Sequence, residues 1–98
     1  MKAVFFVKKD DYSAAKNKLY GDDAVSRQSI TTRDNAAIGE KKEGYYLLVE
    51  GDDKAVAKAK ELMKGTATEL KGKEAGKIES AIQSQEESAA SGFGAIFG

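Results

Sequence analysis

Paired aspartates are the residues of this chain whose type and spacing most readily suggest a chemical role. Six of the seven Asp residues occur as adjacent pairs, which are Asp10-Asp11, Asp22-Asp23 and Asp52-Asp53. Each pair stands where one predicted element gives way to the next. Carboxylate oxygens on flexible loops are the hard ligands that Ca²⁺ and Mg²⁺ prefer. The pairs therefore raise the hypothesis of a divalent-cation site.

Five carboxylates are the candidate metal ligands, because the loops that carry them are expected at one end of a sheet. They are Asp22, Asp23, Glu50, Asp52 and Asp53. Crowded carboxylates repel one another unless a cation or solvent relieves them. In the alternative interpretation, the second pair forms a solvated turn and the third caps a helix and supplies its first-turn acid. The spacing does not match an EF-hand loop.

The remaining pair, Asp10-Asp11, is expected at the opposite end of the sheet, beside Lys41-Lys42. Basic neighbours would neutralise these two carboxylates there, so we do not include them in the candidate site.

Two pairs of adjacent aromatic residues, Phe5-Phe6 and Tyr45-Tyr46, lie in strand-like runs. Side chains alternate between the two faces of a strand, so one member of each pair is expected on the open face of the sheet. An RNA recognition motif stacks bases on such aromatics, but this chain has Glu43 where that motif begins with a basic residue. We therefore expect the C-terminal segment or a second copy, rather than RNA, to cover this face.

Near the C-terminus, Phe93, Ile96 and Phe97 follow the i, i+3, i+4 spacing that places residues on one face of a helix. Such a stripe is typical of a helical peptide that docks into an apolar groove of a partner. The alternatives are that the stripe folds back on its own sheet or frays.

The composition excludes several classes of function. The chain has no Cys and no His, which removes disulfides, nearly all zinc, haem and iron–sulfur sites, and the Ser-His and Cys-His catalytic pairs. Sixteen basic residues balance sixteen acidic ones, so the chain has no net positive charge. Nucleic-acid binding depends on neutralising phosphates, so we do not expect a nucleic-acid partner. We expect no enzymatic activity and no organic cofactor, because a chain of 98 residues has little volume for a catalytic cleft.

Hydrophobic periodicity predicts alternating strands and helices in the first part of the chain. Strands are predicted over 2–8, 25–38 and 45–49 with a mild signal over 66–70, and helices over 12–20 and 53–63. Gly21 and Gly65 stand where these helices would end, and the polar stretch 39–44 is typical of a hairpin loop.

This order, βαββα(β), resembles the ferredoxin-like fold, an α+β arrangement with an antiparallel sheet and two helices on one face. The resemblance covers residues 1–71 and implies no function, since this fold hosts many. Residues 72–98 are expected to form a flexible or partly helical extension, with a weak helix over 73–91 in whose apolar stripe two of the four apolar members are alanine.

These features suggest a small, non-enzymatic binding or regulatory protein, with Ca²⁺ or Mg²⁺ at the acidic loops as the most specific hypothesis. The alternative is a protein-interaction module that uses the open sheet face and the C-terminal Phe/Ile stripe, with a protein partner or a second copy. The apolar run over 3–7 is too short for a secretory signal, and no run is long enough to span a bilayer. We therefore expect a cytoplasmic location without membrane attachment.

Overall fold

The computed structural model describes the backbone of residues 1–97 and the side chains of residues 1–86. Four antiparallel strands form one sheet in the order β2-β3-β1-β4. The strands are β1 (Lys2–Val7), β2 (Ser29–Asp34), β3 (Tyr45–Glu50) and β4 (Thr68–Leu70). This order, with helices between β1 and β2 and between β3 and β4, is that of the ferredoxin-like α+β fold. The predicted fold class is confirmed.

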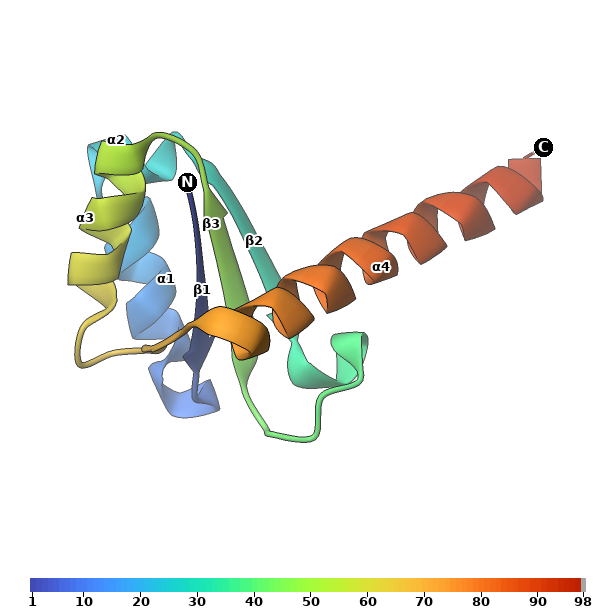
Figure 1. Ribbon diagram of the computed structural model, residues 1–98, viewed down its shortest axis with the longest axis horizontal. Coiled ribbons are helices and arrows are strands. Elements are labelled where there is room, and N and C mark those ends of the chain that lie inside the picture. The colour runs from blue at the N-terminus through green and yellow to red at the C-terminus, as the bar shows by residue number, and fades with distance from the viewer. Residues whose placement is uncertain (98) are drawn as a thin grey trace.

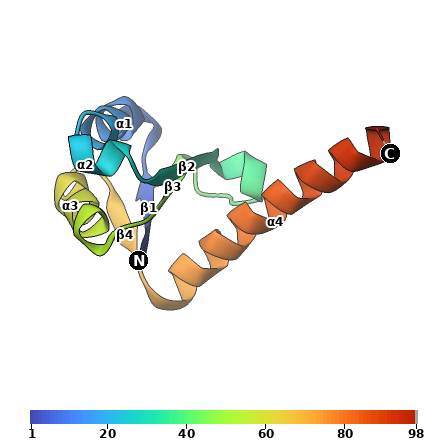
Figure 2. The same cartoon turned by 90° about the horizontal axis from the view of Figure 1, so that it is seen from above.

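Helices cover both faces of the sheet (Figures 1 and 2). One face carries α1 (Tyr12–Tyr20), α2 (Asp23–Ser26) and α3 (Asp53–Met63), and α4 (Gly72–Phe97) crosses the other. Two short 3-10 helices, η1 (Lys9–Asp11) and η2 (Asn35–Ile38), follow β1 and β2. The four-residue helix α2 was not predicted, because a single turn leaves no periodicity to detect.

The two faces of the sheet belong to two separate hydrophobic cores, and alternation along β1 and β3 supplies both. Phe5, Val7, Leu47 and Val49 are among the strand residues that pack against the three helices of the first face. The second core lies beneath α4 and consists of Val4, Phe6, Tyr46, Leu48, Leu70, Ile78 and Ile82. Because both faces are buried, β1 and β3 are nearly continuous apolar runs.

The first half of α4 is packed more closely than its sequence led us to expect. The expected boundary after residue 71 coincides with the start of α4, but Ile78 and Ile82 are each only 1% exposed. Two isoleucines are sufficient here because the sheet supplies the other half of the core. The apolar pattern of the helix alone does not include the burial that the sheet residues provide.

Candidate functional site

The loop before β2 and the loop before α3 meet at one end of the sheet, as the sequence predicted. The backbone N–H of Asp52 donates to Oε1 of Gln28 at 3.0 Å, and the α-amino group of Met1 donates to the carbonyl of Gly51 at 3.1 Å. Gly51 has a φ of 153°, and a Cβ at this position would overlap the side chain of Gln28. Glycine is thus required for the close approach of the two loops.

Asp22 performs two structural tasks at this end of the molecule. It is the N-cap of α2, where its Oδ1 accepts from the N–H of Val25 at 3.0 Å. Its other oxygen lies 2.7 Å from the ammonium group of Lys58 on α3. The hydrogen bond to Lys58, together with the bond from Val25, lowers the pKa of Asp22 below its usual value. Asp22 therefore joins α2 to α3.

The other aspartates of the candidate cation site, Asp23, Asp52 and Asp53, are exposed to solvent. Asp23 is paired with Arg27 one turn later in the chain at 3.2 Å, and Asp53 lies 3.6 Å from the α-amino group of Met1. Asp52 is the N-cap residue of α3, although its side chain makes no capping hydrogen bond. This arrangement is close to the interpretation as capping and first-turn acids.

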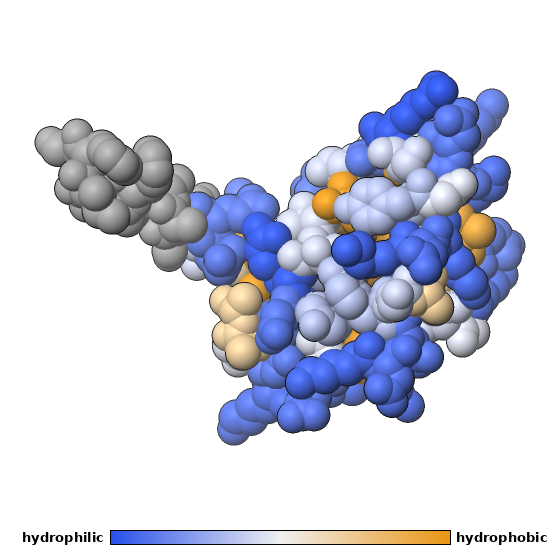
Figure 3. Space-filling view, turned by 180° about the vertical axis from the view of Figure 1, so that it is seen from behind, coloured by the Kyte–Doolittle hydropathy of each residue, from blue (hydrophilic) through white to orange (hydrophobic). Residues whose placement is uncertain are grey.

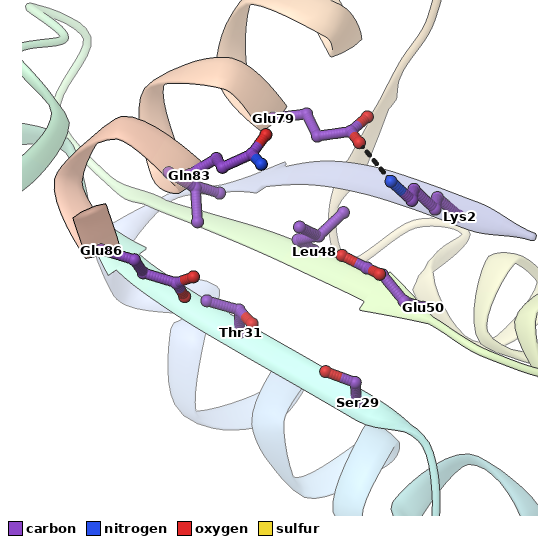
Figure 4. Close-up of a pocket in the computed structure, with 9 residues that line it drawn as sticks. Lys2, Ser29, Thr31, Leu48, Glu50, Glu79, Gln83 and Glu86 are labelled. Atoms are coloured by element: carbon purple, nitrogen blue, oxygen red, sulfur yellow. Dashed lines mark hydrogen bonds and ion pairs between the residues drawn. The ribbon is translucent and has the colours of Figure 1, made fainter. Parts of the chain in front are cut away.

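Glu50, the fifth candidate ligand, lies on the other face of the sheet. It has the same parity along β3 as Leu48, which packs beneath α4. Figure 4 shows its side chain beside Leu48 and Ser29, on the α4 side. Among residues 1–86, whose side chains are described, no group of three acidic residues is placed to hold a metal ion. The cation hypothesis stays a prediction that this geometry does not favour.

Glu50 lines a groove of about 300 Å³ between α4 and the strands β1, β3 and β2 (Figure 4). Lys2 crosses one end of the groove and donates to Oε1 of Glu79 at 2.6 Å. This bond, with the negative charges of Glu79 and Glu50, raises the pKa of Lys2. The polar walls of the groove also include Thr31 and Glu86.

At the opposite end of the sheet, Asp10 and Asp11 line hollows that Lys42 also lines, as the sequence predicted. The ammonium group of Lys42 lies 4.2 Å from the centre of the Phe6 ring, within range of a cation–π interaction.

The aromatic pairs divide between the two cores. Tyr45 stacks on Tyr12 of α1 with 3.8 Å between ring centres. Phe6 and Tyr46 lie beneath α4, each 4% exposed, with 5.2 Å between their ring centres. Burial raises the pKa of Tyr46, with smaller contributions from Glu40 and Glu74. Because α4 covers these two rings, they are not accessible for base stacking.

Polar contacts of its first half fix α4 across the sheet, and they were not predicted from the sequence. The guanidinium of Arg33 donates to Gln85 at 2.8 Å, to Glu86 at 3.1 Å and to the carbonyl of Thr32 at 2.8 Å. Lys77 pairs with Glu40 at 3.4 Å. The parity of Arg33, shared with Tyr46 through the β2–β3 register, was the signal that could have placed Arg33 beneath α4.

The candidate docking residues Phe93, Ile96 and Phe97 belong to α4, but their side chains lie outside the described residues. On the face seen in Figure 3, the described surface is mostly hydrophilic, and apolar residues show only in small separate spots. Residues 1–86 thus present no broad apolar patch on that face.

Comparison of the chain with protein-family models gives no match, and comparisons with curated proteins and with solved structures give none either. Within the described residues, none of the helices has both the length and the apolar character needed to cross a membrane.

Proposed function

We propose that this protein is a non-enzymatic protein-binding module that uses the end of α4 to dock into an apolar groove of a protein partner. The observation that carries the proposal is the continuity of α4, which runs as one helix from Gly72 to Phe97. Its first half is packed on the sheet, and its last residues include the Phe93, Ile96 and Phe97 stripe.

The anchoring of α4 supports this proposal because an anchored helix begins binding with part of its ordering cost already met. Ile78 and Ile82 of α4 lie in the second core. Ion pairs also join α4 to the rest of the fold: Lys2 and Arg33 pair with acidic residues of α4, and Lys77 of α4 pairs with Glu40. A peptide of the same sequence in isolation would be only marginally helical. The ferredoxin-like unit would then act as the support for a preformed helix.

The sequence of the last turns also supports a buried destination. No charged residue follows Glu87, and Phe93, Ile96 and Phe97 are the largest side chains of that stretch. Leaving such side chains in water forgoes about 1.5–3 kcal/mol each relative to full burial. Anchors at i, i+3 and i+4 are those by which amphipathic helices recognise grooves.

A binding experiment with the full chain tests the proposal. The bait is the intact protein, compared with the triple variant F93A/I96A/F97A in extracts of the cells that produce it. The matched control is Ser84→Ala, an exposed position of α4 outside the stripe. A protein retained by the wild type and the control, but not by the triple variant, is then purified and titrated against each form.

The expected result is a saturable interaction with the purified partner that weakens by at least about a hundredfold in the triple variant, since large apolar anchors dominate such interfaces. If the purified partner binds the triple variant as tightly as the wild type, or if no protein distinguishes them, the proposal is wrong.

A further inference from the structure

The two edges of the sheet differ in how well they are protected against pairing with another strand. At one edge, β4 is only three residues long, and its central Glu69 is paired with Lys60 at 3.3 Å. At the other edge, β2 has six residues, and its two charged side chains, Arg33 and Asp34, both lie at its C-terminal end, so the stretch 29–32 carries no charge. Short strands and charged residues are the usual means of blocking an edge, so the uncharged first four residues of β2 make it the less protected edge.

The register shows which backbone groups of β2 point outward. The N–H of Asn35 donates to the carbonyl of Gly44 at 3.0 Å, just beyond the last paired residues of β2 and β3. Hydrogen-bonded pairs alternate along an antiparallel ladder, so Ser29, Thr31 and Arg33 bond to β3. Ile30 and Thr32 therefore direct their backbone groups away from the sheet.

These outward groups have few partners within the described residues. None of the hydrogen bonds of turns and loops there uses the backbone of Ile30. The carbonyl of Thr32 accepts from Nη1 of Arg33 at 2.8 Å, and a carbonyl oxygen has a second lone pair to offer.

We propose that β2 is a self-association surface, on which a second copy of this chain pairs antiparallel through its own β2 about a two-fold axis at Thr31. In this register Ile30 lies opposite Thr32 of the second copy, and Thr32 lies opposite Ile30 of it. The outward backbone N–H and carbonyl groups of the two chains can then hydrogen-bond to each other. The two four-stranded sheets then form a single eight-stranded sheet. The interface is isologous, because both copies use the same surface.

Charge and side-chain pattern favour a second copy over an unrelated extended peptide. The pairing brings no like charges opposite each other, because Thr31 meets Thr31 of the second copy and Arg33 meets Ser29 of it. On its own chain, Ser29 lies beside Glu50 in the β2–β3 register. Glu50 has no ion pair within 4.0 Å among the described residues. Arg33 already donates to Gln85, Glu86 and Thr32 of its own chain, but a guanidinium has five N–H donors, so Arg33 of one copy keeps donors to offer to Glu50 of the other.

Sedimentation velocity over a wide concentration range is the principal test. We expect the wild type to shift toward twice its mass of 10.5 kDa as its concentration rises. The variant Thr31→Lys places two ammonium groups opposite each other at the axis, where like charges destabilise a strand pair. Its dimer should weaken by roughly tenfold or more. Within one chain the new lysine faces Glu50 and Glu86 across the groove, so the fold should be retained.

Three comparisons make this result specific to β2. The control Thr68→Lys adds the same charge to the other edge strand and should leave the dimer unchanged. The triple variant F93A/I96A/F97A should also dimerise as the wild type does, which separates this surface from the proposed docking function. Amide exchange at Ile30 and Thr32 should slow as the dimer forms.

A chain that stays monomeric at every concentration overturns the inference, as does a Thr31→Lys variant that dimerises as tightly as the wild type. Loss of the dimer in the triple variant would also overturn it and would place self-association at the end of α4 instead. In each case, a circular-dichroism melt of the variant confirms that the fold is intact.

Discussion

Asp22 shows how much of the candidate cation site serves local structure. Its two oxygens are engaged with the N–H of Val25 and with Lys58, and these bonds lower its pKa. A carboxyl group whose pKa is lower in the folded than in the unfolded state stabilises the fold above the unfolded value of about 4. That contribution is lost as the pH falls through the folded pKa.

Replacing Asp22 with Asn isolates the charge, because Asn caps a helix about as well as Asp. We expect the wild type to melt at a higher temperature than Asp22→Asn at neutral pH. The difference should shrink below about pH 4 and vanish once Asp22 is protonated. Thermal melts of both proteins across the acid range measure this. A difference that persists unchanged to the lowest pH would show that the charge of Asp22 is not its cause.

A calcium titration addresses the cation hypothesis directly. Asp22, Asp23 and Asp53 each have a basic partner, and Glu50 faces the opposite side of the sheet. A cation would have to displace these partners, so we expect no saturable change in the amide shifts of 21–23 and 50–53 at millimolar calcium. Localised, saturable shifts in those two segments would restore the cation site.

The position of Glu50 could have been predicted from the sequence, whereas that of Asp22 could not. Strand alternation puts Glu50 on the same face as Tyr46 and Leu48, and applying it would have removed Glu50 from the acidic group. The role of Asp22 depends on Lys58, which is distant in sequence and reaches it only through the packing of α2 against α3.

At the scale of elements, the strand order was predictable because each strand has its own signal, although the strand predicted over 25–38 extended beyond β2 into the helical residues of α2 and η2. The apolar runs of β1 and β3 predicted the two central strands, with Gly44 and Gly51 on either side of β3, and even the three-residue β4 fell within its predicted range. The packing of α4 was not predictable in the same way. Its stripe has few large residues, and its stability comes from Val4, Phe6, Tyr46 and Leu48, which belong to other elements.

Substitutions in α4 test whether this packing stabilises the fold. Replacing Ile82 with Ala should lower the free energy of unfolding by about 2–5 kcal/mol, since Ile82 is 1% exposed and its removal leaves a cavity. The neighbouring exposed Gln83→Ala serves as the matched control and should change it by less than about 0.5 kcal/mol. Urea unfolding of both variants provides the measurement. Equal, small effects would mean that α4 is not part of the stable core.

Truncation separates the two halves of the same helix. A chain ending at Glu86 should unfold near the wild-type midpoint, because it keeps Ile78 and Ile82. A chain ending at Lys71 exposes the whole α4 face of the sheet and should unfold at a much lower temperature, if it folds at all. If the shorter chain melted within a few degrees of the full one, residues 72–98 would be the loosely attached extension that the composition suggested.

At the scale of the whole molecule, one sheet divides two cores, and this arrangement predicts a single cooperative unit. Phe5 and Val7 of β1 face one core while Val4 and Phe6 face the other, and β3 is divided in the same way. Removing the helices from either face would leave a one-sided sheet with an exposed apolar surface. Neither core is therefore expected to persist without the other.

Unfolding should accordingly follow one transition, whichever part of the molecule is observed. Amide signals of Ile78 and Ile82 report on α4, and those of Val56 and Ala59 report on α3. We expect both sets to disappear at the same urea concentration and to exchange with the same opening free energy. If the α4 amides exchanged through a separate opening of lower free energy, α4 would form an independent unit. The sheet would then tolerate an uncovered face, and the support of the helix proposed for docking would be lost.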